Sequence, residues 1–429
     1  MSKKFLLLLV ILMLLHTYSF ASGEGLDLIG EGAILIDYDS GAILYEKNMH
    51  EKLYPASTTK IMTAILSIEH GMEYEKMDSM VAVDPEVISL TKGSHIALDY
   101  DEEMSFEDLL NALMIASAND AALALGKNVS GSIEGFIALM NEKAVELGAL
   151  NTNFVNPNGL HDENHYSTAY DLSLIARYAM SNETFREFSS KSSHTIEPTN
   201  KKDEPRYLYS TNEFFYGNNN INIDGQTIPI RYEGVICGKT GYTSHAGNCL
   251  VTLAEKNGTR LITVVLKSNA NHGVYADTHK LLNYGFNNFS KVVVGHANEF
   301  IDNVEIGNGM LPYASIVIED DVNYILKAED MDKVQRKVSI EENIEAPIAK
   351  GDIVGNVEYY LDDTLIGSGD LVSTIDVSEV PPISIFQHIL DKWYLLVFAL
   401  LIITRVLYLY NRSKKRRKRR SSRVYSYRI

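Results

Sequence analysis

Hydrophobic residues follow two different spacings along the central part of the chain. They recur every three or four positions in three long segments, FEDLLNALMIASANDAALALGKNV, IEGFIALMNEKAVELGA and AYDLSLIARYAM. This spacing predicts amphipathic helices. Shorter alternating or continuous apolar runs lie before and after them, in AILIDYDSGAILYEKN and in GVICGKTGYTSHAGNCLVTLAEKNGTRLITVVLK. These runs predict strands, and the first should turn at Asp39-Ser40-Gly41.

The order of these segments predicts the domain organisation. Residues 22–289 have a helix-rich middle between two strand-rich ends, so we expect one sheet that is built from both ends and covered by helices. Residues 290–376 instead contain short alternating stretches broken by Gly and Asp, which predict a small all-β domain. Residues 377–392, which contain SEVPPISIFQH, predict a linker.

The start of the chain predicts export. Residues 1–21 combine a basic start, an apolar run and small residues at Ser19 and Ala21. This is the pattern of a secretory signal peptide that is cleaved before Ser22, and an uncleaved N-terminal anchor is the alternative. The pattern predicts that the body of the protein leaves the cytoplasm.

The end of the chain predicts a membrane anchor. Residues 393–410, WYLLVFALLIITRVLYLY, are just long enough for a transmembrane helix, and their terminal aromatic residues suit the membrane interface. Arg405 is close enough to the basic end to reach the interface. Residues 411–429 include KKRRKRR, which the positive-inside rule keeps in the cytoplasm. A nuclear or nucleic-acid signal is disfavoured beside an apolar segment in an exported chain. We therefore expect a single-pass protein of the cell membrane with an extracytoplasmic body.

Charge separates the body from this tail. The chain carries 39 Lys and Arg against 56 Asp and Glu, and ten of the basic residues follow Tyr410. Without these ten, Lys3 and Lys4, the numbers are 27 and 56, a net charge of −29 for residues 22–410. So acidic a body excludes nucleic-acid binding.

Cysteine and histidine content limits the kinds of site that the chain can hold. Cys237 and Cys249 are the only cysteines, which excludes a disulfide scaffold and a Cys-x-x-Cys metal site. They flank a predicted hairpin, and the alternatives are one cross-strand disulfide or two buried thiols. His161 and His165 have the spacing of a helical metal pair, but their segment, NPNGLHDENHYS, is too rich in Asn, Pro and Gly for a helix. We interpret both as loop residues and expect no metal or organic cofactor.

Candidate chemistry begins with YPASTTK, residues 54–60, before a predicted helix. Ser57 and Lys60 are three positions apart, so their side chains can meet on one helical face. A serine hydroxyl needs a base to become a nucleophile, and a lysine is such a base only if burial or nearby cations lower its pKa. A helix N-cap is the alternative role for Ser57. We interpret a second Ser-x-x-Lys, residues 89–92, as a chance copy in a loop and strand.

Two further elements offer polar side chains in suitable places. Ser117-Ala118-Asn119 interrupts the apolar LMIASANDAALAL, so its hydroxyl and amide can reach a site. Lys239-Thr240-Gly241 ends a strand and offers a cation, a hydroxyl and a glycine that lets a substrate backbone approach. Ser-x-Asn also recurs at residues 210–212, whereas Lys-Thr-Gly occurs once.

In this order and these contexts the three elements resemble those of the penicillin-recognising serine enzymes. More closely, the chain is similar to the D-alanyl-D-alanine carboxypeptidases, the low-molecular-weight penicillin-binding proteins. The similarity runs from about residue 34 to 289 and includes NTNFVNPNGLHDENHYSTAYDLSLIARYAM; the later APIAKGDIVGNVEYYLDDTLIGSGDLV is similar to the domain that commonly follows. The resemblance implies an α+β fold of the β-lactamase/transpeptidase type, with an antiparallel sheet and a helical subdomain, followed by the all-β domain and the transmembrane helix.

The resemblance also implies the catalytic roles. Ser57 would attack the carbonyl between the two D-alanines that end a peptidoglycan stem pentapeptide, with Lys60 as general base. Water would then hydrolyse the acyl-enzyme. Ser117 would pass the proton to the leaving D-alanine, and Asn119 would orient Lys60 and hold the substrate amide. β-Lactams, which mimic the substrate, would acylate Ser57.

The remaining elements would bind the substrate. Lys239 and Thr240 would contact its terminal carboxylate beside Gly241, and the backbone N–H groups of Ser57 and Tyr242 would form an oxyanion hole. Some family members carry an arginine shortly before the position of Asp277, and NANHGVYADTHKLL lacks one. Recognition would then fall on side chains that can donate hydrogen bonds: Lys239, Thr240, and Thr243 or His272.

Two other functions remain as alternatives at this point. One is a β-lactamase-like hydrolase, against which the all-β domain and the anchor argue. The other is a catalytically weak penicillin-binding or wall-binding protein, for which the missing arginine is the only indication. A second departure from the family, Gly238 where an apolar residue is more common, removes no catalytic group.

Overall fold

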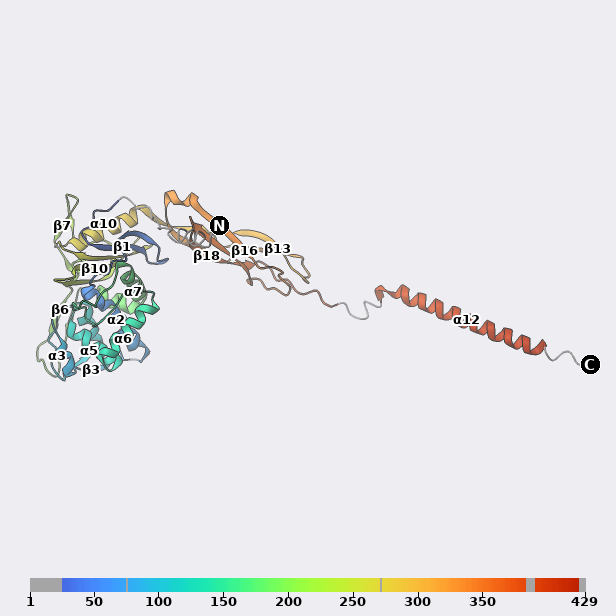
Figure 1. Ribbon diagram of the computed structural model, residues 1–429, viewed down its shortest axis with the longest axis horizontal. Helices are drawn as coiled ribbons and strands as arrows, with labels where there is room; N and C mark the ends of the chain where they lie inside the picture. Colours follow the sequence, from blue (N-terminus) through green and yellow to red (C-terminus); the bar gives the residue numbers. More distant parts are fainter. Residues whose placement is uncertain (1–24, 75, 271, 383–389, 424–429) are drawn as a thin grey trace, which may run out of the picture. The chain divides into compact units, whose positions relative to one another are not determined.

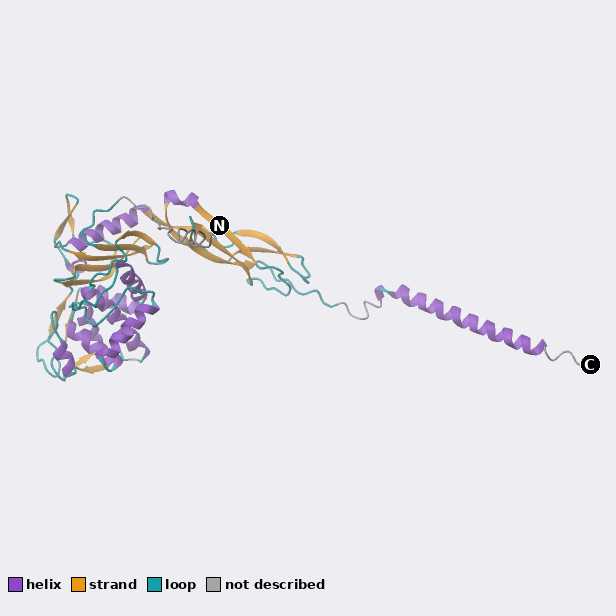
Figure 2. Ribbon diagram, viewed as in Figure 1, coloured by secondary structure: helices purple, strands orange, loops and turns teal. Residues whose placement is uncertain are grey.

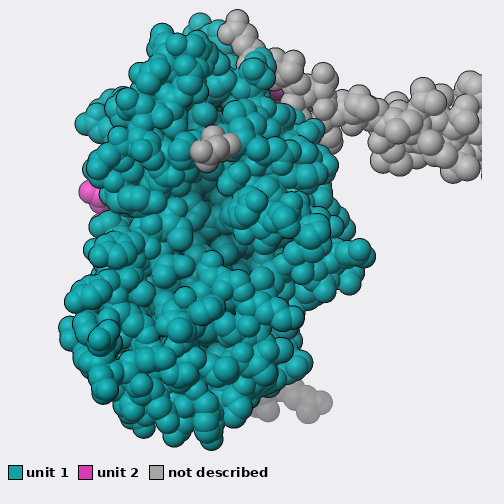
Figure 3. Space-filling view, turned by 90° about the vertical axis from the view of Figure 1, so that its left-hand side faces the viewer, with its two compact units in different colours: residues 1–293, 323–334 teal, residues 294–322, 335–429 magenta. Residues whose placement is uncertain are grey.

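The computed structural model describes residues 25–74, 76–270, 272–382 and 390–423. The predicted signal peptide and part of the predicted linker lie outside these residues. The chain divides into two compact units, which we call the N-terminal unit (residues 1–293 and 323–334) and the C-terminal unit (residues 294–322 and 335–429). Figure 3 shows one face of the N-terminal unit, which is hollowed near its middle.

A sheet runs through the N-terminal unit (Figure 1). Among the described residues it has five strands in the order β2-β1-β11-β10-β9, with every neighbouring pair antiparallel. The strands are β1 Gly32–Asp37, β2 Ile43–Lys47, β9 Val235–Thr243, β10 Gly247–Lys256 and β11 Thr259–Ser268. Gly32 of β1 lies opposite Leu266 of β11. The sheet is therefore built from both ends of the region, and the hairpin turn at residues 39–41 is also confirmed.

Helices cover both faces of this sheet (Figure 2). They are α2 Lys60–Glu73, α4 Phe106–Met114, α5 Asn119–Ser130, α6 Ile133–Glu146, α7 Ala169–Ser181, α8 Glu183–Ser190 and α10 Gly273–Asn288. Strand β1 shows why both faces are buried: Ile34 and Ile36 enter the core formed with α2 to α8, whereas Ala33 and Leu35 enter the core formed with α10. A strand buried on both faces needs a continuous apolar run, which is what the sequence contains.

Short elements complete this unit. They are the one-turn helix η1 Ala56–Thr59, α3 Pro85–Leu90, α9 Glu213–Tyr216, η2 Ala328–Lys333, and the pairs β3 Met80–Ala82 with β4 Glu103–Ser105, β5 Ser193–Ile196 with β6 Arg206–Tyr209, and β7 Asn220–Ile223 with β8 Gln226–Pro229. The prediction of loop and strand for residues 89–92 is wrong in part, since Ser89 and Leu90 end α3. The helix starts at Pro85 because Asp84 caps it, accepting a hydrogen bond from the Glu86 N–H.

The C-terminal unit contains the predicted all-β domain. Its main sheet has the order β13-β14-β18-β17-β16 in the described part of the chain. The strands are β13 Phe300–Glu305, β14 Tyr313–Ile318, β16 Val334–Ile340, β17 Ile353–Leu361 and β18 Thr364–Ser373. Strand β12 (Phe289–Gly295) pairs with β15 (Val322–Lys327). Residues 323–334 group with the N-terminal unit, although they lie inside the range expected for the all-β domain.

The chain continues into a long helix, α12 (Trp393–Arg423). Within the described residues, Trp393–Lys418 is the one helical stretch that is long and apolar enough to span a membrane. The helix extends past the apolar run of residues 393–410 because Lys and Arg, which follow the run, are good helix formers. A candidate membrane span therefore stands where the sequence predicts one.

Candidate active site

Ser57 lies in η1, where the chain turns sharply before α2. Ala56 has a left-handed φ of 49°, which makes this turn. Two glycines let other segments approach it closely. A Cβ atom at Gly241 of β9 would lie 2.9 Å from the Ser57 nitrogen, and one at Gly159 would lie 1.9 Å from the Ala56 carbonyl oxygen. Side chains at either position would displace the turn that carries the serine.

The amine of Lys60 is fully buried and faces three oxygen atoms in the described part of the chain. Its Nζ lies 3.0 Å from Ser57 Oγ, 2.7 Å from Asn119 Oδ1 and 2.6 Å from the Asn158 carbonyl oxygen. The amide and carbonyl oxygens can only accept hydrogen bonds. A neutral amine has two N–H groups, which these two oxygens take. Its lone pair is then left facing the Ser57 hydroxyl.

Burial makes this neutral form accessible. Removal from water lowers the pKa of Lys60 well below its ordinary value, the charge of Lys239 lowers it further, and the Asp120 carboxylate raises it. Burial lowers the pKa of Lys239 to about 7. The hypothesis from the sequence requires a lysine with a depressed pKa beside the serine, and the burial of Lys60 and its 3.0 Å distance from Ser57 Oγ are consistent with it.

A second hydroxyl lies beside the second lysine. Ser117 sits between α4 and α5 with a left-handed φ of 55°, so the interruption that the sequence predicts is present. Lys239 Nζ donates to Ser117 Oγ at 3.0 Å and to the Thr240 carbonyl oxygen at 3.1 Å. Asn119 Nδ2 donates to the Lys92 carbonyl oxygen at 2.6 Å. This bond fixes the orientation of the amide and leaves Oδ1 for the first lysine.

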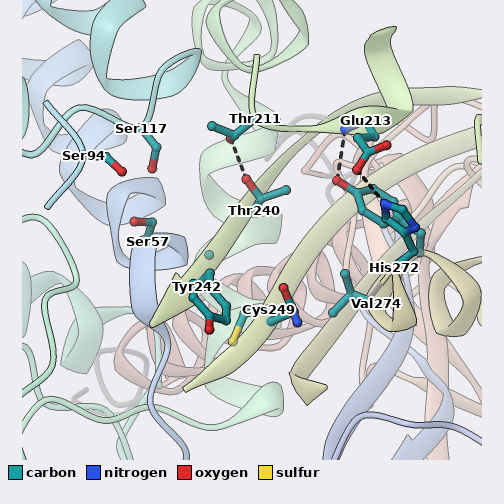
Figure 4. A pocket seen from close by; sticks show the side chains of 13 residues that line it. Ser57, Ser94, Ser117, Thr211, Glu213, Thr240, Tyr242, Cys249, His272 and Val274 are labelled. Carbon is teal, nitrogen blue, oxygen red and sulfur yellow. Dashed lines mark hydrogen bonds and ion pairs between the residues drawn. The ribbon is translucent and has the colours of Figure 1, made fainter. Parts of the chain in front are cut away.

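These groups open into a cavity of about 280 Å³. Its lining is polar and comes from segments far apart in sequence: Ser57, Ser94, Ser117, Thr211, Glu213, Thr240, Gly241, Tyr242, Asn248, Cys249, His272, Val274 and Tyr275. Figure 4 shows Ser57 and Ser117 on one side, Glu213 and His272 on the other, and Thr240 between them. The cavity is thus open to a ligand that spans from the nucleophile to the His272 side.

The structure brings together most of the residues proposed from the sequence. Six of them line the cavity: Ser57, Ser117, Thr240, Gly241, Tyr242 and His272. Lys60, Asn119 and Lys239 are buried and contact the lining serines or each other. Thr243 is not among the described residues that line the cavity, and its Oγ1 accepts a hydrogen bond from the Ala246 N–H in the turn after β9.

Sequence reasoning missed several residues of the site. Thr211 Oγ1 lies 2.6 Å from Thr240 Oγ1, so residues 210–212, a Ser-x-Asn that was not assigned to the site, contribute a cavity side chain. Glu213 Oε1 lies 2.9 Å from His272 Nε2 on the side where the arginine is missing. Asn158 contributes only a backbone oxygen, for which the sequence carries no signal.

Structure decides the open question about the cysteines. Cys237 in β9 and Cys249 in β10 are both free and buried. In the register of these strands, Cys237 lies opposite Leu253 and Cys249 opposite Gly241, so the two sulfur atoms are not paired across the hairpin. Burial raises the pKa of each thiol to about 12. The disulfide alternative is therefore wrong.

Three further residues from the sequence analysis are explained by their surroundings. His161 and His165 lie in a loop, as predicted. The His165 ring is buried and contacts Thr59 Oγ1 at 2.8 Å, so it fastens this loop to the turn before α2. A Cβ atom at Gly238 would lie 2.5 Å from the Val251 carbonyl oxygen, which explains the glycine at that position.

Comparison with known proteins identifies the family. Residues 21–270 match the model of peptidase family S11, D-alanyl-D-alanine carboxypeptidase, and residues 289–379 match the C-terminal domain of penicillin-binding protein 5. The chain belongs to the S11 family of D-alanyl-D-alanine carboxypeptidases. The resemblance inferred from its motifs is thereby confirmed, and so is its assignment to the hydrolases.

Individual relatives of this S11 protein match it over nearly their whole length. The D-alanyl-D-alanine carboxypeptidase DacF of Bacillus subtilis (strain 168) is 32% identical over 366 residues, which cover 85% of this chain and 90% of that protein. DacC of Escherichia coli (strain K12) is 31% identical over 363 residues, covering 81% and 84%. The structure of penicillin-binding protein 5 from Haemophilus influenzae has a TM-score of 0.66 at 29% identity, covering 83% of this chain and 100% of that one. The predicted fold class is confirmed.

Proposed function

We propose that this S11 carboxypeptidase removes the terminal D-alanine from peptidoglycan stem pentapeptides through an acyl-enzyme on Ser57. One observation carries the proposal. The Lys60 amine is 3.0 Å from Ser57 Oγ, while Asn119 and the Asn158 carbonyl accept its N–H groups. A buried lysine in this arrangement is a base aimed at the serine.

In the acylation step Ser57 Oγ attacks the carbonyl carbon between the two D-alanines, and its proton moves to the Lys60 amine. Negative charge develops on the carbonyl oxygen, for which the backbone N–H groups of Ser57 and Tyr242 are the proposed donors. Such donors are commonly worth about 3–4 kcal/mol in the transition state. The closeness of β9 to η1 at Gly241 supports this pairing of N–H groups from two segments.

The leaving D-alanine needs a proton on its nitrogen as the C–N bond breaks. Ser117 is the proposed donor, because its hydroxyl lines the cavity and Lys239 Nζ lies 3.0 Å from Ser117 Oγ. Lys239 restores the proton to Ser117. Water then attacks the ester carbonyl and gives up a proton, which returns through Ser117 to Lys239, and the oxygen of Ser57 leaves with a proton. Lys60, charged after the first step, supplies that proton and returns to its neutral form.

The substrate carboxylate is placed between the two sides of the cavity. Thr240 offers a hydroxyl there, and the buried Lys239 adds positive charge beside Ser117. His272, from the stretch without arginine, lines the cavity and pairs with Glu213, so this pair bounds the carboxylate site on that side. Thr243 contributes by ordering the turn after β9.

β-Lactams, which share the shape of the D-Ala-D-Ala unit, should acylate the same serine and leave slowly. An anchor in helix α12 would keep the reaction at the cell membrane. With the basic tail in the cytoplasm, the cavity faces the extracytoplasmic side, where peptidoglycan lies. The family membership and the candidate span of residues 393–418 support this location.

The test is release of D-alanine from a peptide that ends in D-Ala-D-Ala. Full-length protein in detergent should release it, and Ser57→Ala protein should not. The same two samples are incubated with a fluorescent penicillin, which should label the parent alone. A protein that turns over penicillin rapidly but not the peptide would instead be a β-lactamase-like hydrolase. Stable labelling of Ser57 without release of D-alanine would leave a penicillin-binding protein of weak activity.

A further inference from the structure

The C-terminal unit has an apolar edge at the place where the chain leaves it. Two segments form this edge, residues 308–313 and 378–380, which we call the tip. The Met310 N–H donates to the Ser378 carbonyl oxygen at 2.9 Å, and the Val380 N–H donates to the Asn308 carbonyl oxygen at 2.8 Å. The first segment is therefore held directly beside the last folded residues before the membrane helix.

Large apolar side chains of the tip point into solvent. Met310 is 64% exposed, Leu311 48%, Tyr313 58% and Val380 49%. Neighbouring exposed apolar residues of this kind mark a surface that binds something. Their main-chain bonds hold them in place, so the exposure belongs to a fixed edge and not to a loose end of the chain.

Charge distinguishes the tip from the rest of the body. No charged residue occurs from Ile306 to Ile318, and Glu379 is the only one in the two segments of the tip. The body as a whole has a net charge of −29. Anionic lipid headgroups repel an acidic surface. An uncharged apolar edge is therefore the part of this unit that can contact a bilayer with the lowest electrostatic cost.

Chain length keeps the tip near the membrane. Val380 precedes Trp393, the first residue of α12, by 13 residues. Even a fully extended chain of that length spans at most ~45 Å. The intervening PPISIFQHILDK contains one acidic and one basic residue. The tip is thus the part of the folded unit with the shortest tether to the candidate span.

We propose that the tip inserts its exposed side chains into the surface of the bilayer that α12 spans. Met310 and Leu311 would enter the boundary of the hydrocarbon, and Tyr313 would sit at the headgroup level, which aromatic residues with a polar end prefer. The contact would fix the orientation of the C-terminal unit on the membrane. It is independent of the catalytic proposal, because no residue of the cavity takes part.

The buried thiols make a direct test practical. Cys237 and Cys249 are 0% and 1% exposed, so a thiol reagent should react preferentially with a single introduced cysteine in the folded protein. Because Cys249 lines the cavity, the parent protein is treated with the same reagent as a control. Met310→Cys and Leu311→Cys full-length proteins are labelled with an environment-sensitive fluorophore and reconstituted into vesicles of phosphatidylethanolamine and phosphatidylglycerol that carry a nitroxide-labelled lipid. Leu365→Cys is the control. Leu365 is 52% exposed and lies at the other end of β18, ~26 Å along the strand from Ser373.

We expect blue-shifted emission and loss of fluorescence by nitroxide quenching for the two tip probes, with neither effect at residue 365. Equal quenching at the tip and at residue 365 would overturn the proposal, whether both probes were quenched or neither was. Flotation of the same vesicles establishes that α12 holds the protein in the bilayer. Release of D-alanine by the labelled proteins is measured separately, so failure of the catalytic proposal cannot be mistaken for failure of this one.

Discussion

Two segments of the chain share the Ser-x-x-Lys spacing and differ in their surroundings. In residues 57–60 the lysine is fully buried and its amine contacts the serine hydroxyl. In residues 89–92 the lysine is exposed, and the Ser89 hydroxyl donates to the Glu86 carbonyl oxygen of its own helix. Spacing therefore supplies only proximity. Burial, a second cation and two acceptor oxygens distinguish the lysine that we propose as the base.

The second segment nevertheless supports the first through its main chain. The Lys92 carbonyl accepts from Asn119 Nδ2, and the Ser94 carbonyl accepts from the Asn119 N–H at 2.8 Å. Asp120, which is 1% exposed, accepts from the Ile96 and Leu98 N–H groups. The loop after α3 is thus fastened to the residues that position Lys60. Four predictions test how far the two segments differ.

Single substitutions of Ser57 and Ser89 should differ most in their effect on activity. Ser57→Ala should lower kcat for release of D-alanine by about 10⁴-fold or more, as expected for loss of a nucleophile. Ser89→Ala should keep the parent activity. Both variants are assayed with the D-Ala-D-Ala peptide and with fluorescent penicillin. Comparable losses in the two would mean that Ser57 is not the nucleophile.

Single substitutions of Lys60 and Lys92 should give the next largest difference in activity. Lys60→Met should reduce acylation by about 10²–10⁴-fold, the usual contribution of a general base. A pH profile sharpens this test. Because the pKa of Lys60 is depressed, the parent amine is neutral above that depressed pKa, and acylation should fall as the pH is lowered through it. The rate constant for penicillin labelling is measured at each pH.

We call this fall in the acylation rate at low pH the acid limb of the profile. The Lys60→Met protein should lack the acid limb, because no amine remains to be protonated. An unchanged limb in the variant would show that another group is the base. Lys92→Met is the matched control for side-chain volume and charge.

Asp120→Asn should have an intermediate effect and lower the rate constant for acylation by about tenfold, because the loop after α3 loses a charged hydrogen-bond acceptor. The carboxylate raises the pKa of Lys60, so its loss should also move the acid limb to lower pH. A merely structural role would lower the rate without moving the limb. Asp101→Asn, at an exposed position near the same loop, is the control and should change neither quantity.

The smallest expected effect is that of Lys92→Met. The side chain is exposed, and only its backbone oxygen contacts the site. Surface substitutions usually change free energies by less than about 0.5 kcal/mol, so kcat/KM should stay within about twofold of the parent value. A larger loss in the peptide assay would mean that the second segment acts through its charge as well as its backbone.

Local patterns predicted the parts of the fold that depend on neighbouring residues. The break at Ser117, the strand β1 and the hairpin turn at Asp39-Ser40-Gly41 follow from spacing within a few positions. The C-terminal helix also followed, although its continuation to Arg423 depends on helix propensity and not on hydrophobicity.

The remaining parts of the site depend on contacts that no local pattern encodes. Asn158 acts through a carbonyl oxygen, which every residue type has. Thr211 and Glu213 reach the cavity only because their segment meets distant parts of the chain there. The grouping of residues 323–334 with the N-terminal unit likewise reflects tertiary packing. Motif resemblance found the side chains that we propose as catalytic, whereas the loops that hold them became visible only in three dimensions.

The topology of the sheet also imposes an order in time. Gly32 and Leu266, paired in neighbouring strands, are more than two hundred residues apart in the chain, and closing so long a loop is slow. The central strands β1 and β11 cannot join until nearly the whole N-terminal unit has been synthesised. Lys239 belongs to β9 in the same sheet, so the side chains of the proposed site can come together only after most of the N-terminal unit has been synthesised.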